Sequence, residues 1–157
     1  MEKELVEGKT IWIKLPYGEF IVDNSGEVVL IAGGTGITAF SAYLEGLKPE
    51  GDQKVYLFYG ARSENLLIFH EMLSKVARSV PRFHLQFFLE SAQQQTTING
   101  FKPMIGKLDA HLIWQEIEKP MHAIYYLSGP PAMLKRFSSE LNSCGISNNQ
   151  IHIDAWE

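Results

Sequence analysis

The sequence predicts an α/β fold, a doubly wound sheet of five parallel strands with helices on both faces. Short, continuous apolar runs, typical of strands buried on both faces, alternate with segments in which apolar residues recur at helical spacing. Two of these runs are followed by glycine-bearing turns that open helices, at residues 33–36 and 128–131. A regular alternation of strands and helices implies a parallel sheet with right-handed crossovers.

The N-terminal part of the chain does not follow this alternation. Residues 11–15 and 20–22 are short runs of strand formers, and the Pro-Tyr-Gly sequence at residues 16–18 provides a turn between them. We therefore expect an N-terminal β-hairpin. It divides the chain into a short first segment, residues 1–26, and one main domain, residues 27–157.

The first half of the main domain predicts three strands and two helices. Residues 28–32, 55–59 and 83–89 have the length and apolar character of buried strands. Helical spacing of apolar residues is found between them, in residues 38–47 and 65–79. Each strand is thus followed by a crossover long enough to return the chain to the same edge of the sheet.

The second half begins with residues 90–106, which are polar and lack clear periodicity, so we expect a loop there. The remaining elements are a helix, a strand, a helix and a strand, at residues 108–117, 123–127, 131–144 and 151–153. Pro131 suits the first turn of a helix, and Gly145 suits the end of one. If the five strands are numbered along the chain, their expected order across the sheet is 3-2-1-4-5.

Composition excludes several classes of protein. The net charge of −4 and the dispersed lysines disfavour a nucleic-acid-binding surface. Every apolar run is shorter than the roughly 18–20 residues that cross a bilayer, so we expect no membrane span. The single cysteine, Cys144, forms no internal disulfide, which favours a cytoplasmic protein. The five histidines show no metal-binding spacing, so no metal site is expected.

The first glycine turn fits a dinucleotide-binding pattern, because Gly34, Gly36 and Ala39 match G-x-G-x-x-A between a strand and a helix. Such a turn lets the backbone approach a pyrophosphate, and the start of the helix offers it N–H groups and a partial positive charge. The pattern also has an acidic residue about 20 positions further on. Here that position falls near Tyr59 and has no carboxylate. Taken alone, the glycine turn can therefore be explained either by nucleotide binding or by tight packing of the strand against the helix.

Three motifs stand at wide spacing along the chain: Gly33-Gly34-Thr35-Gly36-Ile37, Tyr59-Gly60-Ala61-Arg62 and Ser128-Gly129-Pro130-Pro131-Ala132-Met133. The chain ends in Asp154-Ala155-Trp156-Glu157. Taken together, these motifs resemble the NAD(P)-binding domain of the ferredoxin–NADP reductase superfamily. In that family a flavin-binding barrel precedes the nicotinamide domain. The segment at residues 15–20, Leu-Pro-Tyr-Gly-Glu-Phe, resembles the last hairpin of that barrel. The resemblance thus implies that residues 1–26 are a remnant of the barrel. The family's flavin motif is missing, so FAD would come from an absent domain or a partner.

The resemblance also implies roles for single residues. Thr35 and Ser128 would bracket the nicotinamide and Trp156 would lie near the nicotinamide–flavin junction, which makes these three the candidate catalytic residues. The pyrophosphate would be lined by Gly34, Gly36, Gly129 and Pro130. The adenosine side would be framed by Arg62, Glu90 and Met133. The cofactor-binding set is completed by Gly33, Ile37 and Ser91.

Three positions depart from the family pattern. Ala39 replaces a proline, Ser128 replaces a cysteine, and Glu90-Ser91 stands where NADP-using members commonly carry serine–arginine. A carboxylate at position 90 would accept a hydrogen bond from a ribose 2′-hydroxyl and repel a 2′-phosphate. Arg62 argues the other way, since arginine suits phosphate recognition. The balance favours NADH over NADPH.

The predicted function is the pyridine-nucleotide module of a flavin-dependent electron-transfer reductase. It would hold NAD(P)H for hydride transfer to a flavin bound by another domain or chain, and the isolated chain would be poorly active. Two alternatives stay open. One is a non-catalytic nucleotide-binding or regulatory domain that has lost its flavin partner, and the other is a solitary α/β interaction domain with a vestigial cleft.

Overall fold

The computed structural model describes residue 10 and residues 21–22, 26–91 and 96–154. The N-terminal hairpin predicted at residues 11–22 lies outside these residues, apart from Ile21 and Val22. The division of the chain at residue 26 therefore stays a prediction.

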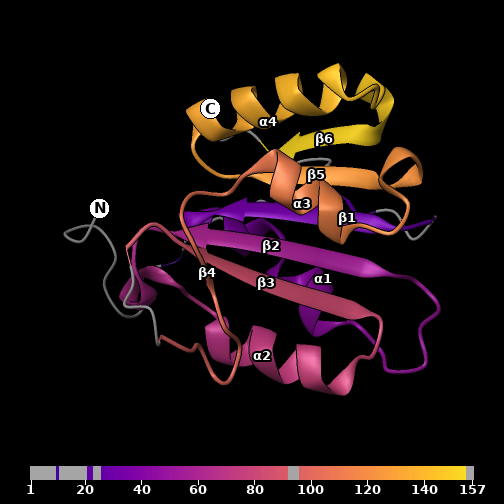
Figure 1. Ribbon diagram of the computed structural model, residues 1–157. Helices are drawn as coiled ribbons and strands as arrows, with labels where there is room; N and C mark the ends of the chain where they lie inside the picture. The colour runs from indigo at the N-terminus through magenta and orange to yellow at the C-terminus, as the bar shows by residue number, and fades with distance from the viewer. Residues whose placement is uncertain (1–9, 11–20, 23–25, 92–95, 155–157) are drawn as a thin grey trace.

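Six parallel strands form one sheet in the order β4-β3-β2-β1-β5-β6 (Figure 1). Their bounds are β1 Val28–Gly33, β2 Val55–Ala61, β3 Phe83–Leu89, β4 Met104–Ile105, β5 Ile124–Ser128 and β6 Ile151–Asp154. The five predicted strands and their order are confirmed. The sequence missed β4, a two-residue strand that pairs with Phe88 and Leu89 inside the region expected to be a loop.

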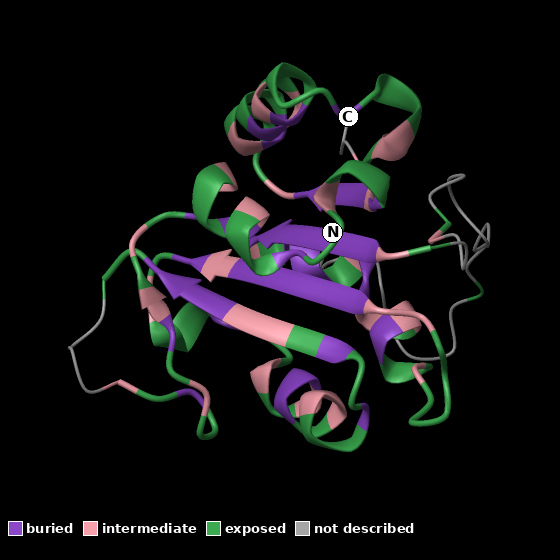
Figure 2. Ribbon diagram, turned by 45° about the vertical axis from the view of Figure 1, so that its right-hand side comes forward, coloured by how far each residue is buried: buried purple, intermediate pink, exposed green. Residues whose placement is uncertain are grey.

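The central strand, β1, separates two apolar layers. Leu30 and Ala32 face one layer, and Val29 and Ile31 face the other. All six residues of β1 are buried, which explains why the sequence shows a continuous apolar run rather than an alternating one. Figure 2 shows this arrangement, with buried strands in the middle and exposed residues on the outer sides of the helices.

Four α-helices cover the two faces of the sheet. On one face lie α1 Ser41–Glu45 and α2 His70–Ser79, which contribute Leu44 and Leu73 to the core. On the other lie α3 Ala110–Glu116 and α4 Pro131–Ser143, which contribute Ile113 and Phe137. Four short 3-10 helices complete the described elements: η1 Gly34–Ala39, η2 Glu64–Leu66, η3 Pro120–His122 and η4 Asn148–Gln150.

Two helices begin later than the sequence predicts, for reasons that are local. Residues 34–39 form a 3-10 helix, so α1 starts only at Ser41. The helix expected from residue 65 is interrupted at Phe69, whose φ of 59° is left-handed. A left-handed residue cannot continue a right-handed helix, so α2 starts at His70. At the other end of the chain, α4 has the expected start at Pro131 and ends at Ser143.

Candidate nucleotide-binding site

The two glycine loops meet at one edge of the sheet, because the strands that carry them are neighbours. Strands β1 and β5 pair in parallel, with Ala32 opposite Ser128, so both chains leave the sheet at the same edge. From β1 the chain continues to β2 and β3 on one side, whereas β5 and β6 lie on the other. The strand order therefore reverses between the two loops, and ligands of open α/β sheets bind at such a point.

Gly36 packs directly against the second loop. It is buried, and a Cβ atom at this position would lie 2.3 Å from the carbonyl oxygen of Ser128 and 2.7 Å from the amide nitrogen of Gly129. A contact with the protein's own backbone thus requires glycine here, and Gly36 lets the two loops touch. The role of Gly36 in lining a pyrophosphate stays a prediction.

Met133 fills the space between the same two loops. A Cβ atom on Gly33 would lie 2.6 Å from its sulfur, and one on Gly129 would lie 2.8 Å from its terminal methyl group. Pro130 also lies close to that position on Gly33, at 3.0 Å. Of the residues assigned to the adenosine side, Met133 is thus placed at the junction of the glycine loops.

Gly34 and Thr35 form the open part of the first loop. Gly34 has a left-handed φ of 56°, which favours glycine, and a Cβ atom there would meet nothing within 4 Å. Thr35 is exposed, whereas the next residues, Gly36 and Ile37, are buried. The backbone at Gly34–Thr35 is therefore the stretch of this loop that a ligand can approach.

Arg62, Glu90 and Ser91 come together on the other side of the first loop. They follow β2 and β3, and two backbone hydrogen bonds continue the pairing beyond the strands: Glu90 donates to Ala61 at 3.1 Å and Ser91 donates to Arg62 at 2.9 Å. All three residues are exposed at the carboxyl edge of the sheet. The geometry thus groups these predicted adenosine-side residues at one place.

Lys107 joins this group, although no sequence motif points to it. Its ammonium nitrogen lies 3.9 Å from a carboxylate oxygen of Glu90. The missed strand β4 brings it there, and Gly106, just before it, donates a hydrogen bond to Leu89. Both side chains of the pair are largely exposed, so the pair contributes little to stability. The positive charge of Lys107 reduces the negative charge that a ligand beside Glu90 would encounter.

Ser128 is completely buried, and its hydroxyl donates a 3.0 Å hydrogen bond to a carboxylate oxygen of Asp154. Asp154 lies at the end of β6, directly opposite Ser128 in the register of the sheet. The sequence indicated Asp154 only as part of the acidic–aromatic ending of the chain. The third candidate catalytic residue, Trp156, lies outside the described residues.

The Tyr-Gly pair of the second motif has a structural role. A Cβ atom on Gly60 would lie 2.7 Å from the side chain of Leu108, so glycine allows the segment that leads into α3 to pack closely on the sheet. Tyr59 is fully buried, and its hydroxyl accepts a 3.1 Å hydrogen bond from the N–H of Ile68. Burial raises the pKa of Tyr59 to about 12. The tyrosine thereby anchors the loop that carries Arg62.

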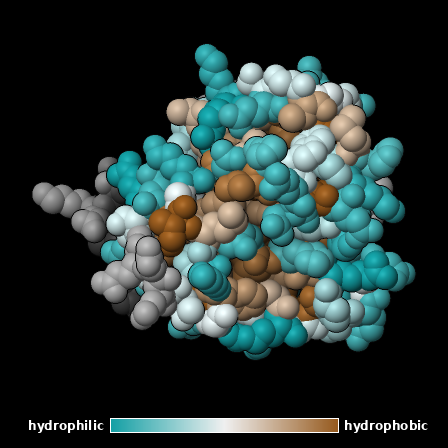
Figure 3. Space-filling view, viewed as in Figure 1, coloured by the Kyte–Doolittle hydropathy of each residue, from teal (hydrophilic) through white to brown (hydrophobic). Residues whose placement is uncertain are grey.

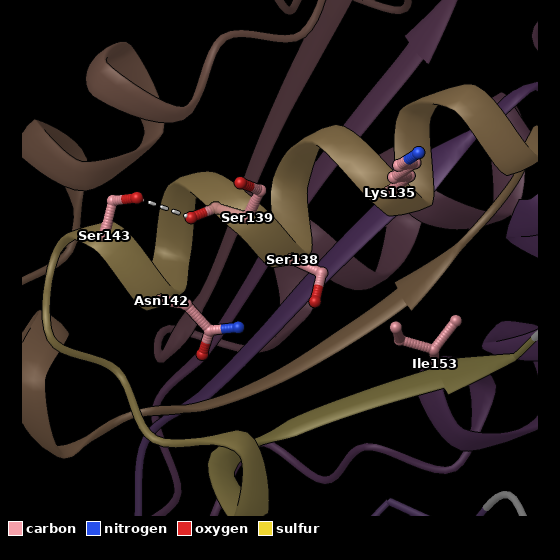
Figure 4. Close-up of a pocket in the computed structure, with 6 residues that line it drawn as sticks. All are labelled: Lys135, Ser138, Ser139, Asn142, Ser143 and Ile153. Atoms are coloured by element: carbon pink, nitrogen blue, oxygen red, sulfur yellow. Dashed lines mark hydrogen bonds between the residues drawn. The ribbon is translucent and has the colours of Figure 1, made fainter.

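A pocket of about 590 Å³ lies away from these loops, between α4 and β6 (Figure 4). Five of its six lining residues are of polar type, and they are Lys135, Ser138, Ser139, Asn142 and Ser143; the sixth is Ile153. None of the motif residues lines it. The view in Figure 3 shows hydrophobic residues as separate spots on a mostly hydrophilic face.

The described part of the chain offers no group of three or more histidine, cysteine, aspartate or glutamate side chains that could bind a metal ion. Within the same residues, no helix has the length and apolar character needed to cross a membrane.

Comparison with known proteins identifies the family. The family model described as the oxidoreductase NAD-binding domain matches residues 30–139. The chain belongs to this family. The matched residues run from β1 into α4, so this NAD-binding domain contains both glycine loops and the Arg62–Glu90 group within the family's boundaries.

Relatives of this NAD-binding domain are longer proteins. One of the subunits of the Na(+)-translocating NADH-quinone reductase of Neisseria meningitidis is 26% identical over 153 residues, which cover 96% of this chain and 38% of the relative. The flavohemoprotein of Rhizobium meliloti is 25% identical over 158 residues, which cover 99% of this chain and 39% of the relative. The chain thus spans about two fifths of the length of these relatives.

Solved structures share the fold of this NAD-binding domain. The flavohem-like FAD/NAD-binding domain of a nitric oxide dioxygenase from Vibrio cholerae has a TM-score of 0.74 at 20% identity, over 90% of this chain and 56% of that one. The CS-b5R domains of human Ncb5or, in the NAD⁺ form, have a TM-score of 0.73 at 20% identity, over 89% and 40%. The expected ferredoxin reductase-like fold is confirmed.

Proposed function

We propose that this chain is the pyridine-nucleotide module of a flavin-dependent electron-transfer reductase. It holds NADH, or NADPH, so that the nicotinamide can pass hydride to a flavin on another domain or chain. One observation carries the proposal. The two glycine loops touch where the strand order reverses, and Gly34 and Thr35 are left open beside the contact. Membership of the NAD-binding family supports the same ligand.

The residues present suit a dinucleotide. Gly34 offers an open backbone for the pyrophosphate, and the N-terminus of α4, a helix of 13 residues, adds a partial positive charge beside it. Thr35 and Ser128 stand on the two loops that would flank the nicotinamide. The nicotinamide and the flavin supply the redox chemistry, whereas these residues fix the orientation of the ring and the charge around it.

Glu90 favours NADH over NADPH in this proposal. Its carboxylate is exposed beside Arg62 and would accept a hydrogen bond from a ribose 2′-hydroxyl but repel a phosphate. Lys107, 3.9 Å away, offsets part of that negative charge. The preference is therefore one of degree.

FAD supplied by a second domain or a partner chain is the further part of the proposal. The relatives are more than twice as long as this chain, and the names of several structural neighbours include FAD. A regulatory nucleotide-binding domain without a flavin partner is the alternative. Hydride transfer to a flavin domain would distinguish the two.

Nucleotide binding tests the proposal directly. We expect the parent chain to bind NADH in calorimetric titrations and Gly34→Ala to bind it at least about tenfold more weakly, a loss of about 1.4 kcal/mol. The added Cβ would enter the open side of the loop, where nothing else lies within 4 Å. The matched control is Gly26→Ala, which changes a left-handed glycine at the opposite edge of the sheet. Equal NADH affinity in the parent, Gly34→Ala and Gly26→Ala would place the site elsewhere.

A further inference from the structure

The hydrogen bond from Ser128 to Asp154 places a negative charge at the edge of the sheet where the glycine loops meet. Ser128 is fully buried and Asp154 is half-buried, and their oxygens are 3.0 Å apart. The ion pairs found among the described residues do not include Asp154. Among the described residues, the carboxylate thus accepts a hydrogen bond from a neutral hydroxyl and forms no ion pair.

The register of the sheet shows which face this charge occupies. Tyr126 in β5 faces the layer that contains α1 and α2, and side chains alternate along a strand, so Ser128 faces the same layer. Its hydrogen bond holds the Asp154 carboxylate on that face too. The first glycine loop lies there as well, because its Ile37 and the following Phe40 belong to the core of that layer. The carboxylate and the open Gly34–Thr35 turn therefore lie on the same face of the sheet, at its carboxyl edge.

We infer that Asp154 is a specificity-determining residue that favours the oxidised nicotinamide over the reduced one. The inference rests on the proposed function, in which the nicotinamide lies beside Thr35 and Ser128. NAD⁺ and NADH differ at that ring by one positive charge, so a nearby carboxylate attracts the oxidised form and leaves the reduced form nearly unaffected. Ser128 acts as a positioning residue, since its hydroxyl holds the carboxylate in place.

A consequence for hydride donation follows from thermodynamic linkage. A group that tightens the binding of NAD⁺ relative to NADH lowers the reduction potential of the bound couple. For a two-electron couple, each tenfold change in the ratio of the two dissociation constants shifts the potential by about 30 mV. Asp154 thus makes the bound NADH a stronger reductant.

The test compares NAD⁺, NADH and AMP on the parent and three variants at one fixed salt concentration. Asp154→Asn keeps the shape and a hydrogen-bond acceptor for Ser128 but removes the charge. Asp154→Glu keeps the charge. Asp52→Asn removes an equal charge at the opposite edge of the sheet, before β2, and controls for net charge. AMP carries the adenosine half alone and reports on the rest of the cleft.

We expect Asp154→Asn to weaken NAD⁺ binding by at least about fivefold and to change NADH and AMP binding by less than about twofold. Asp154→Glu should restore most of the NAD⁺ affinity, and Asp52→Asn should bind all three ligands as the parent does. An equal loss for NAD⁺ and NADH, or an unchanged ratio, would overturn the inference and leave the proposed function standing. A parent chain that binds neither form of the dinucleotide would overturn both.

Discussion

At the scale of single residues, the glycines of the two loops have different tasks although their sequence pattern treats them alike. Gly33, Gly36 and Gly129 leave room for atoms of the protein itself, the nearest of which would lie 2.3 to 2.8 Å from a hypothetical Cβ. Gly34 leaves room for something outside the protein. The first three therefore build the junction of the loops, and Gly34 is the one whose Cβ position is open to a ligand.

This difference predicts that two neighbouring substitutions destabilise the protein to different degrees. Gly36→Ala should lower the free energy of unfolding by about 1–3 kcal/mol, the usual cost of overpacking, because its Cβ would press on the backbone of Ser128. Gly34→Ala meets no such contact and should lose only about 1 kcal/mol from its left-handed backbone. Urea denaturation of both variants measures the difference. A Gly36→Ala protein as stable as the parent would mean that the loops do not touch in solution.

Cofactor choice also belongs to the residue scale. The double change Glu90→Ser with Ser91→Arg replaces a carboxylate by a guanidinium at the carboxyl edge of β3, so NADPH affinity should rise at least about tenfold, or 1.4 kcal/mol. NADH affinity should change less. The single variant Lys107→Ala is the matched control, because it removes the cation beside Glu90 and should weaken NADPH binding instead. A parent that already prefers NADPH would show that Arg62 and Lys107 outweigh Glu90.

At the scale of elements, α3 shows how one side chain sets where a helix begins. The carboxylate of Asp109 accepts hydrogen bonds from the N–H groups of His111 and Leu112, both at 3.0 Å. These groups have no partner within the helix, so the cap satisfies them. The helix begins at Ala110, directly after the cap.

Loss of this cap should cost about 1 kcal/mol of unfolding free energy in Asp109→Ala. Asp109→Asn keeps an oxygen acceptor at the same place and should cost much less. Thermal or urea denaturation of the two variants decides the matter. Equal losses would show that the charge of Asp109, rather than its hydrogen bonds, stabilises α3.

The elements also show how far the sequence could go. The five predicted strands are recognisable as continuous apolar runs, because strands buried on both faces need apolar residues on both sides. Strand β4 has two residues and is visible only through its pairing with β3. The backbone at Phe69 is left-handed, and the loop before it is held by contacts with the rest of the fold. Leu67 is buried, and the N–H of Ile68 donates a hydrogen bond to the hydroxyl of Tyr59 in β2. A two-residue strand and a hydrogen bond between separate segments produce no periodic pattern in the sequence, so the sequence could not predict them.

The same limit applies to the site. Motif spacing located the two glycine loops and the Arg62–Glu90 group, because parallel strands deliver their ends to one edge. The partners of Ser128 and Glu90 come from neighbouring strands. The register of β6 against β5 places Asp154 opposite Ser128, and the pairing of β4 with β3 brings Lys107 to Glu90. The motifs identify the loops but cannot identify these partners.

At the scale of the whole molecule, the two edges of the sheet differ. At the amino edge, Lys54 pairs with Glu118 and the N–H of Lys119 donates to Glu27, so these loops are tied to one another. At the carboxyl edge, Gly34, Thr35 and Arg62 stand open. The amino-edge loops are thus held together by charged side chains, whereas the proposed chemistry belongs to the carboxyl edge.

The proposed division of labour predicts the behaviour of the isolated chain. It should carry no tightly bound flavin and should transfer hydride from NADH to added FAD only slowly. Fusion to a flavin domain of a relative should produce rapid anaerobic loss of flavin colour on addition of NADH. The same fusion with Gly34→Ala is the control and should be slow. A yellow isolated chain with rapid turnover would refute the division.

The contact of Gly36 with Ser128 joins positions that lie about 90 residues apart along the chain. Until β5 has taken its place, the first loop lacks its contact with the second loop. During synthesis the ribosome must therefore release most of the chain before a dinucleotide can be captured. A truncated product that ends before β5 should have no affinity for it, so only chains that have completed the sheet would gain the added stability of a bound nucleotide.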